Sequence, residues 1–204
     1  AEVPNSYYFT STTLRKAFLK TSTFGITLFQ SKVYVAGGKN KKGIVEKEVL
    51  MFDGSEEKFK LICMLPEARY GLSIIFFNDY LYVSGGYDEN GTQLSSVIRY
   101  CFTTKTWTTV QSMLEPRSNH HMIEANDCIY ALGGKKNTIE EFCPKRNEWK
   151  VVYESEILST LESTIELYVH NRELLKEFKI LLDERTGEIN VLPEEHREPD
   201  YDYR

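Results

Sequence analysis

The feature that most constrains the fold is a six-residue string that occurs three times at a constant interval. In each copy an apolar segment with tyrosine in second place ends in two glycines, and the copies begin at residues 33, 81 and 129, a period of 48 residues. The copies are Val33-Tyr34-Val35-Ala36-Gly37-Gly38, Leu81-Tyr82-Val83-Ser84-Gly85-Gly86 and Ile129-Tyr130-Ala131-Leu132-Gly133-Gly134. A repeat of this length predicts a solenoid or propeller, in which each unit buries its apolar face against its neighbours.

Each string follows a short polar turn and another apolar run. The turns are Gln30-Ser31-Lys32, Asn78-Asp79 and Asn126-Asp127. Two short apolar runs joined by a tight turn of this composition predict a β-hairpin.

A pair of large apolar residues seven positions apart follows each string and predicts a second hairpin. The pairs are Phe52 and Phe59, Tyr100 and Trp107, and Phe142 and Trp149, each with a polar, turn-like segment between its members. Two hairpins per repeat form a four-stranded antiparallel sheet, which is one propeller blade.

These residues resemble the Kelch repeat over about residues 21–153: a diglycine after an apolar strand, an aromatic pair ending in tryptophan, then Met-x-x-x-Arg. The resemblance implies an all-β Kelch β-propeller made of four-stranded antiparallel blades. The diglycines would let the strand ends crowd against neighbouring backbone where a Cβ would clash. Trp107 and Trp149 would fill the gaps between blades, with their polar tips bonded to backbone.

We expect about four blades plus an N-terminal half-blade, as part of a larger propeller spanning residues 1–192. The half-blade is residues 7–20, the repeats are about 23–63, 70–112 and 119–153, and a degenerate repeat is 163–192. In the degenerate repeat Phe178-Lys179 replaces the diglycine, and Leu182 and Ile189 replace the aromatic pair. Residues 154–182 also fit a helix, and periodicity alone leaves both alternatives open. Residues 193–204 are expected to be an acidic flexible tail.

Composition argues against several classes of protein. The formal net charge is −5 and the pI is about 5.5, so we expect no nucleic-acid partner. The apolar runs are too short for a membrane span. Cys63, Cys101, Cys128 and Cys143 form no metal-binding spacing and are expected to be reduced and mostly buried. We expect the protein in the cytoplasm, with the nucleus as the alternative.

No pattern of residues predicts catalysis, a cofactor or a metal site. Motifs of serine hydrolases, zinc proteases and phosphate-binding loops are missing from the sequence. The adjacent His120 and His121 would face opposite ways on a strand, with His121 between blades and His120 at a blade edge. The carboxylates, Glu140 and Glu141 among them, are expected in turns without an apolar setting for acid–base chemistry.

The resemblance is closest to the Kelch propellers of BTB–BACK–Kelch proteins, and it implies a protein-interaction module. In that family the propeller recognises a substrate, and cullin-3 is engaged through a BTB domain, which these residues do not contain. Two other hypotheses remain: an actin or cytoskeletal scaffold, and a Kelch-type oxidase or sugar-binding enzyme.

Family recognition uses the loops after the diglycines and the loops that enter the next blade. The corresponding candidate residues here are Lys39, Asn40, Arg69, Tyr70, Tyr87, Asp88, Arg117, Ser118, Asn119 and Lys135. Arginine can hold a carboxylate through two parallel hydrogen bonds, so an acidic protein or peptide ligand is expected. The alternative for Arg69 and Arg117 is that they bond to backbone carbonyls of neighbouring blades.

Overall fold

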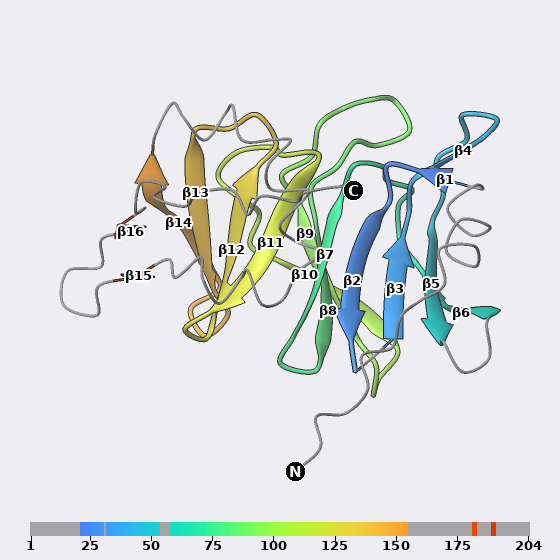
Figure 1. Ribbon diagram of the computed structural model, residues 1–204, viewed down its shortest axis with the longest axis horizontal. Helices are drawn as coiled ribbons and strands as arrows, with labels where there is room; N and C mark the ends of the chain where they lie inside the picture. Colours follow the sequence, from blue (N-terminus) through green and yellow to red (C-terminus); the bar gives the residue numbers. More distant parts are fainter. Residues whose placement is uncertain (1–20, 31, 54–57, 155–180, 183–188, 191–204) are drawn as a thin grey trace, which may run out of the picture.

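The computed structural model describes residues 21–30, 32–53, 58–154, 181–182 and 189–190. These residues form strands and connecting loops without a helix, so the predicted all-β class is confirmed for this part of the chain. Three four-stranded antiparallel sheets follow one another along the sequence and stand side by side (Figure 1).

The strands of each sheet follow chain order from its first strand to its last. The first sheet holds β2 (Gly25–Phe29), β3 (Lys32–Ala36), β5 (Glu48–Asp53) and β6 (Lys58–Met64). The second holds β7 (Ser73–Phe77), β8 (Tyr80–Ser84), β9 (Val97–Cys101) and β10 (Thr106–Val110). The third holds β11 (His120–Ala125), β12 (Cys128–Gly133), β13 (Thr138–Cys143) and β14 (Glu148–Glu154). Two short pairs join β1 (Thr21–Ser22) to β4 (Lys39–Asn40) and β15 (Leu181–Leu182) to β16 (Ile189–Asn190).

The first strands of the sheets adjoin one another: β7 contacts both β2 and β11. Both faces of β7 are therefore covered, and all five of its residues, Ser-Ile-Ile-Phe-Phe, are buried. Its side chains alternate between two cores. Ile74 and Phe76 join a cluster with residues of the first sheet, whereas Ile75 and Phe77 join a cluster with residues of the third. The sheets thus pack face to face as propeller blades do.

The hairpin registers agree with the residue spacing in the sequence. Asn78 and Asp79 have φ angles of 45° and 63°, the left-handed conformation that a two-residue hairpin turn requires. In the outer hairpins the members of each aromatic pair lie directly opposite each other: Phe52 faces Phe59, Tyr100 faces Trp107, and Phe142 faces Trp149.

In the first two pairs the first glycine lies against the linker to the next sheet, residues 65–72 after the first sheet and 111–119 after the second. A Cβ on Gly37 would stand 2.3 Å from the carbonyl oxygen of Arg69, and one on Gly85 would stand 2.2 Å from that of Arg117. The second glycine donates its N–H to the same carbonyl, at 2.8 Å in both repeats. The close approach expected at the diglycines is confirmed for the first two pairs, and it ties the ends of β3 and β8 to the following linkers.

The two tryptophans join adjacent sheets as expected. Nε1 of Trp107 donates to the carbonyl oxygen of Met64 at 2.8 Å, and Nε1 of Trp149 donates to that of Gln111 at 2.9 Å. Each indole therefore bonds to backbone at the end of the preceding sheet.

Part of the predicted domain organisation falls outside the described residues. This holds for the half-blade at 7–20, the tail at 193–204, and most of the degenerate repeat and its helical alternative. Within that repeat, β15 and β16 pair Leu182 with Ile189. This is the same register as the aromatic pairs of the three complete sheets.

Candidate functional site

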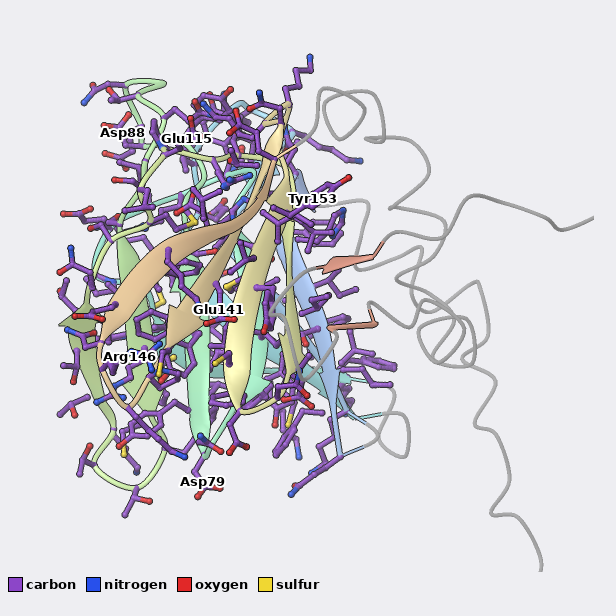
Figure 2. The ribbon with its side chains drawn as sticks, turned by 90° about the vertical axis from the view of Figure 1, so that its left-hand side faces the viewer. Asp79, Asp88, Glu115, Glu141, Arg146 and Tyr153 are labelled. Carbon is purple, nitrogen blue, oxygen red and sulfur yellow. The ribbon has the colours of Figure 1, made fainter. Side chains whose placement is uncertain are left out.

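The loops after the diglycines lie at one end of the molecule, and we call this end the loop face (residues 38–46, 66–71, 86–95, 114–119 and 134–137). Figure 2 shows Asp88 and Glu115 at this end and Asp79, in the hairpin turn of β7 and β8, at the opposite end. Loops from successive sheets are therefore presented on one surface.

Tyr70, Tyr87 and Lys39 form a cluster on this face. Tyr70 and Tyr87 exchange backbone hydrogen bonds at 3.1 and 2.7 Å, which join the linker into the second sheet to the loop after Gly86. Their rings stack with centroids 5.1 Å apart, and Nζ of Lys39 stands 3.6 Å from the centroid of the Tyr70 ring. All three side chains are half-buried, so each has a surface that a partner could cover.

Asn40 and Asp88 occupy equivalent positions in their loops, and both organise their own loop. Oδ1 of Asn40 accepts the N–H groups of Lys42 and Ile44 at 2.9 and 3.1 Å. Oδ1 of Asp88 accepts those of Asn90 and Thr92 at 2.9 and 2.8 Å. The bond from Thr92, with that from Asn90, holds the pKa of the Asp88 carboxyl below its usual range. These two side chains shape the loops from within.

Ser118, Asn119 and Lys135 differ in exposure. Ser118 is buried, and its Oγ accepts a hydrogen bond from Nε2 of Gln93 at 2.9 Å. Asn119 is exposed, has a φ of 50°, and donates its backbone N–H to Gly71 at 2.7 Å. Lys135 is exposed directly after the third diglycine, with a φ of 61°. Of these three, Asn119 and Lys135 present their side chains at the surface.

Arg117 belongs to the linker into the third sheet, and its side chain is fully buried against that sheet. Its guanidinium donates to the carbonyl oxygens of Gly133 and Thr138, both at 3.0 Å, and to Thr138 Oγ1 at 2.7 Å. Nε and one terminal nitrogen each reach Glu140 Oε1 at 3.0 Å. These contacts support the alternative that this arginine bonds to a neighbouring blade.

Arg69 holds the equivalent position one repeat earlier with much weaker contacts. It is 3% exposed, and one terminal nitrogen stands 3.5 Å from the Gly85 carbonyl oxygen and 3.4 Å from that of Ser96. Its Nε has no hydrogen-bond partner among the described residues. Burial lowers the pKa of this guanidinium, and the nearby Glu67 carboxylate opposes that effect.

The expectation that Glu140 and Glu141 lie in turns is wrong. Both belong to β13, with exposed fractions of 0% and 8%. Glu140 Oε2 accepts the Leu114 N–H at 2.6 Å, and Glu141 Oε2 accepts the Tyr130 hydroxyl at 2.8 Å. Comparison of the repeats could have predicted the burial of Glu140, because the equivalent positions hold the apolar Leu50 and Ile98. A glutamate at a core position requires a buried partner.

The expected placement of the histidines is also wrong. His120 is buried, and its Nε2 lies 2.7 Å from Ser84 Oγ in the second sheet, whereas His121 is half-buried. Desolvation, with the Arg117 charge as a second cause, lowers the pKa of His120 to about 3. Its imidazole is therefore neutral at pH 7 and serves the contact between sheets.

The described residues contain no group of three metal-ligating side chains. No helix in this part of the chain is long and apolar enough to cross a bilayer. The four cysteines are free thiols, of which Cys143 is buried and the other three are half-buried.

Comparison with known proteins identifies the repeat. The Kelch-repeat domain of KLHDC2, KLHL20 and DRC7 matches residues 23–173. The chain belongs to this Kelch-repeat family. The predicted β-propeller class is thereby supported at the level of sequence as well as of structure, and membership in this family suggests a protein-interaction module.

A solved structure gives the same fold at low sequence identity. The structure of YjhT superposes with a TM-score of 0.56 and 12% identity, over 66% of this chain and 52% of that one. This chain therefore spans about half the length of YjhT, and the likeness concerns the fold alone. A search of curated proteins found no match.

Proposed function

We propose that this chain is the substrate-recognition propeller of a cullin-3 ubiquitin-ligase adaptor, and that the loop face holds the substrate. The observation that carries the recognition part is the cluster of Tyr70, Tyr87 and Lys39. Tyrosine is among the residues that most often dominate binding energy at interfaces. Stacking and the backbone bonds between Tyr70 and Tyr87 hold the cluster in place before binding, which reduces the entropy lost on association.

The preferred ligand is a peptide segment with acidic residues facing the first loop. Lys39, Lys41 and Lys42 belong to that loop, and the last two are exposed. The second loop contains Asp88 and Glu89, which would repel acidic residues of the peptide. Charge complementarity therefore sets the direction in which a peptide lies across the face.

Peptide selection tests the recognition part. Displayed peptides would be selected on the full chain, and their affinities measured for the wild type and for Tyr87→Ala. We expect ligands with roughly micromolar Kd that weaken at least about tenfold in the variant. Tyr80→Ala is the matched control, because Tyr80 begins β8 whereas Tyr87 follows its other end. Equal weakening by both substitutions would place the ligand elsewhere.

Co-precipitation tests the ligase part separately. The full-length protein should recover cullin-3, and removal of any BTB domain from it should abolish this recovery while peptide binding persists. If cullin-3 is not recovered and the protein co-sediments with actin filaments, the scaffold alternative replaces the ligase proposal.

A further inference from the structure

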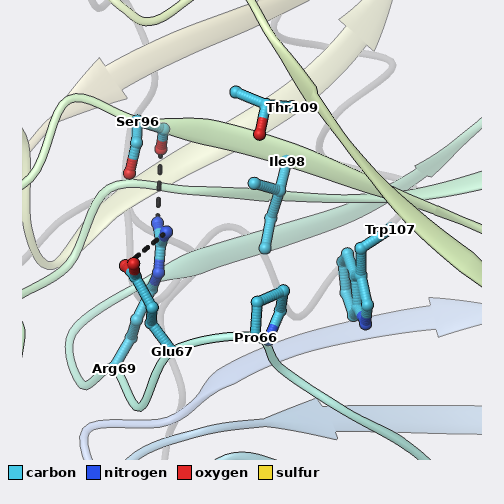
Figure 3. Close-up of a pocket in the computed structure, with 7 residues that line it drawn as sticks. All are labelled: Pro66, Glu67, Arg69, Ser96, Ile98, Trp107 and Thr109. Atoms are coloured by element: carbon cyan, nitrogen blue, oxygen red, sulfur yellow. Dashed lines mark hydrogen bonds and ion pairs between the residues drawn. The ribbon is translucent and has the colours of Figure 1, made fainter.

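A cavity of about 250 Å³ lies beside Arg69, at the junction between the second sheet and the linker that enters it. It is lined by Pro66, Glu67, Arg69, Ser96, Ile98, Trp107 and Thr109 (Figure 3). Thr109 and Trp107 belong to β10, the last strand of the second sheet, so the cavity lies toward the outer side of the junction. It is distinct from the cluster of Tyr70, Tyr87 and Lys39.

The equivalent position in the third sheet, beside Arg117, shows which group such a cavity can contain. Glu140 lies opposite Val151 and two residues before Phe142, as Ile98 lies opposite Thr109 and two residues before Tyr100. Glu140 fills its junction with a carboxylate that bonds to Arg117. Ile98 brings no carboxylate to Arg69.

The surroundings of the two arginines otherwise correspond closely. Arg117 reaches the carbonyl oxygens of Gly133 and Thr138, and Arg69 lies near those of Gly85 and Ser96. An acidic residue two positions earlier lies 3.8 Å from Arg117 and 3.7 Å from Arg69. What the first junction lacks is the central carboxylate. The Nε of Arg117 donates to that group, and the Nε of Arg69 is the atom left without a described partner.

A second difference accompanies the first. The backbone N–H of Leu114 donates to Glu140, and the equivalent residue is Pro66, which has no N–H. The first junction thus lacks both the carboxylate and one of the backbone donors that bond to it at the next junction, while a buried arginine is present at both. Figure 3 shows the Arg69 guanidinium between Glu67 and Ser96, with Ile98, Pro66 and Trp107 around the remaining space.

The geometry points to a binding site in which the side chain of a partner's glutamate enters this cavity and bonds to Arg69. Its carboxylate would take the position that Glu140 takes at the next junction, and its methylene groups would lie against Ile98 and Trp107. The volume is below the roughly 300–1,000 Å³ of a drug-sized pocket and suits one side chain. The Nε of Arg69 is buried without a hydrogen-bond partner among the described residues, and such a group is costly. A carboxylate that accepts its hydrogen bond therefore binds more favourably here than it would on an open surface.

Glu67 does not exclude a second carboxylate. It is 71% exposed and lies 3.7 Å from Arg69. At the next junction Glu115 stands in the same relation to Arg117 while Glu140 is present. The site needs only the protein-interaction part of the function proposed above, and it would stand if the cullin-3 part failed.

Nuclear magnetic resonance with capped amino acids tests the site without knowledge of the partner. N-acetyl-glutamate N-methylamide would be titrated into the ¹⁵N-labelled full chain at pH 7. We expect the indole signal of Trp107 to shift while that of Trp149, whose junction already contains Glu140, stays in place. The glutamine analogue should half-saturate at a concentration at least about tenfold higher, because it lacks the charge. N-acetylglycine reports whether a terminal carboxylate is accepted equally well, in which case the specificity for a glutamate side chain is rejected. No shift of Trp107, or equal shifts with the glutamine analogue, would overturn the site.

A pair of substitutions gives an independent result. Ile98→Glu supplies the carboxylate from within the chain, and Ile98→Gln is its neutral match with the same loss of apolar packing. We expect the glutamate variant to unfold at a temperature about 3 °C or more above the glutamine variant and to lose binding of the capped glutamate. A glutamate variant that melts below the glutamine variant would show that Arg69 cannot accept a carboxylate.

Discussion

At the scale of single residues, the repeat places identical side chains in unlike surroundings. Arg69 and Arg117 are equivalent and both buried, yet only Arg117 has a carboxylate with no exposed surface beside it. A buried ion pair does not by itself add stability, because both ions lose their hydration. Removal of either partner is nevertheless destabilising, because it leaves the other charge buried and uncompensated.

The Arg117–Glu140 pair leads to the first prediction. Glu140→Gln should lower the free energy of unfolding by about 2–4 kcal/mol, since it leaves the buried Arg117 charge with only the partly exposed Glu115 carboxylate, 3.8 Å away, as a counter-ion. Glu67→Gln is the control, because that carboxylate is exposed and 3.7 Å from its arginine, and it should change stability by no more than about 0.5 kcal/mol. Urea denaturation of both variants at pH 7 gives the comparison. Equal midpoints would contradict the buried pair.

The second prediction concerns the close approach at a diglycine. Gly85→Ala puts a Cβ 2.2 Å from the Arg117 carbonyl oxygen, at a φ of 56°. Gly43→Ala has a similar backbone penalty, at a φ of 79°, but nothing within 4 Å of the new atom. We expect a loss of about 1 kcal/mol for Gly43→Ala and about 3 kcal/mol or more for Gly85→Ala. Thermal melts of the two variants that coincide would show that backbone conformation alone selects the glycines.

At the scale of elements, the hairpin turns offer a third prediction. Asp79 has a φ of 63° and an exposed side chain in the turn between β7 and β8. Asn-Gly suits such a turn better than Asn-Asp, so Asp79→Gly should stabilise the protein by about 0.5 kcal/mol. Asp79→Ala should destabilise it by about 0.5–1 kcal/mol, because alanine tolerates a positive φ poorly. Chemical denaturation should give the order glycine, aspartate, alanine, and a more stable alanine variant would rule out this explanation.

The elements were largely predictable from sequence, whereas the contacts within the candidate site were not. A period of 48 residues and aromatic pairs seven apart give the strand order and the register, because turn length and pleat fix which residues face each other. The position of Arg117 was readable, but its burial depended on Glu140, 23 residues away on another element. Such a contact leaves no local pattern. Only comparison between repeats, with glutamate where Leu50 and Ile98 stand, would have indicated it.

At the scale of the whole molecule, stability depends on contacts between sheets. Trp107 and Trp149 each bond to the preceding sheet, and each linker is held by the second glycine of a pair. His120 belongs to the same class of contact, since it joins the third sheet to Ser84 of the second. Protonation of His120 would therefore weaken the contact between the second and third sheets.

This dependence gives the last prediction, on pH. The folded state holds the pKa of His120 at about 3, below the value of about 6.5 expected in the unfolded chain. As pH falls below 6.5, the unfolded state binds a proton that the folded state does not, so stability present at pH 7 is lost. The free energy of unfolding then falls with a slope that approaches about 1.4 kcal/mol per pH unit, which amounts to a loss of roughly 2 kcal/mol between pH 6.5 and 5. Denaturation midpoints at pH 7, 6 and 5 should show this loss in the wild type and a flatter profile in His120→Gln, whose amide does not titrate. Parallel profiles would assign the pH dependence to other groups.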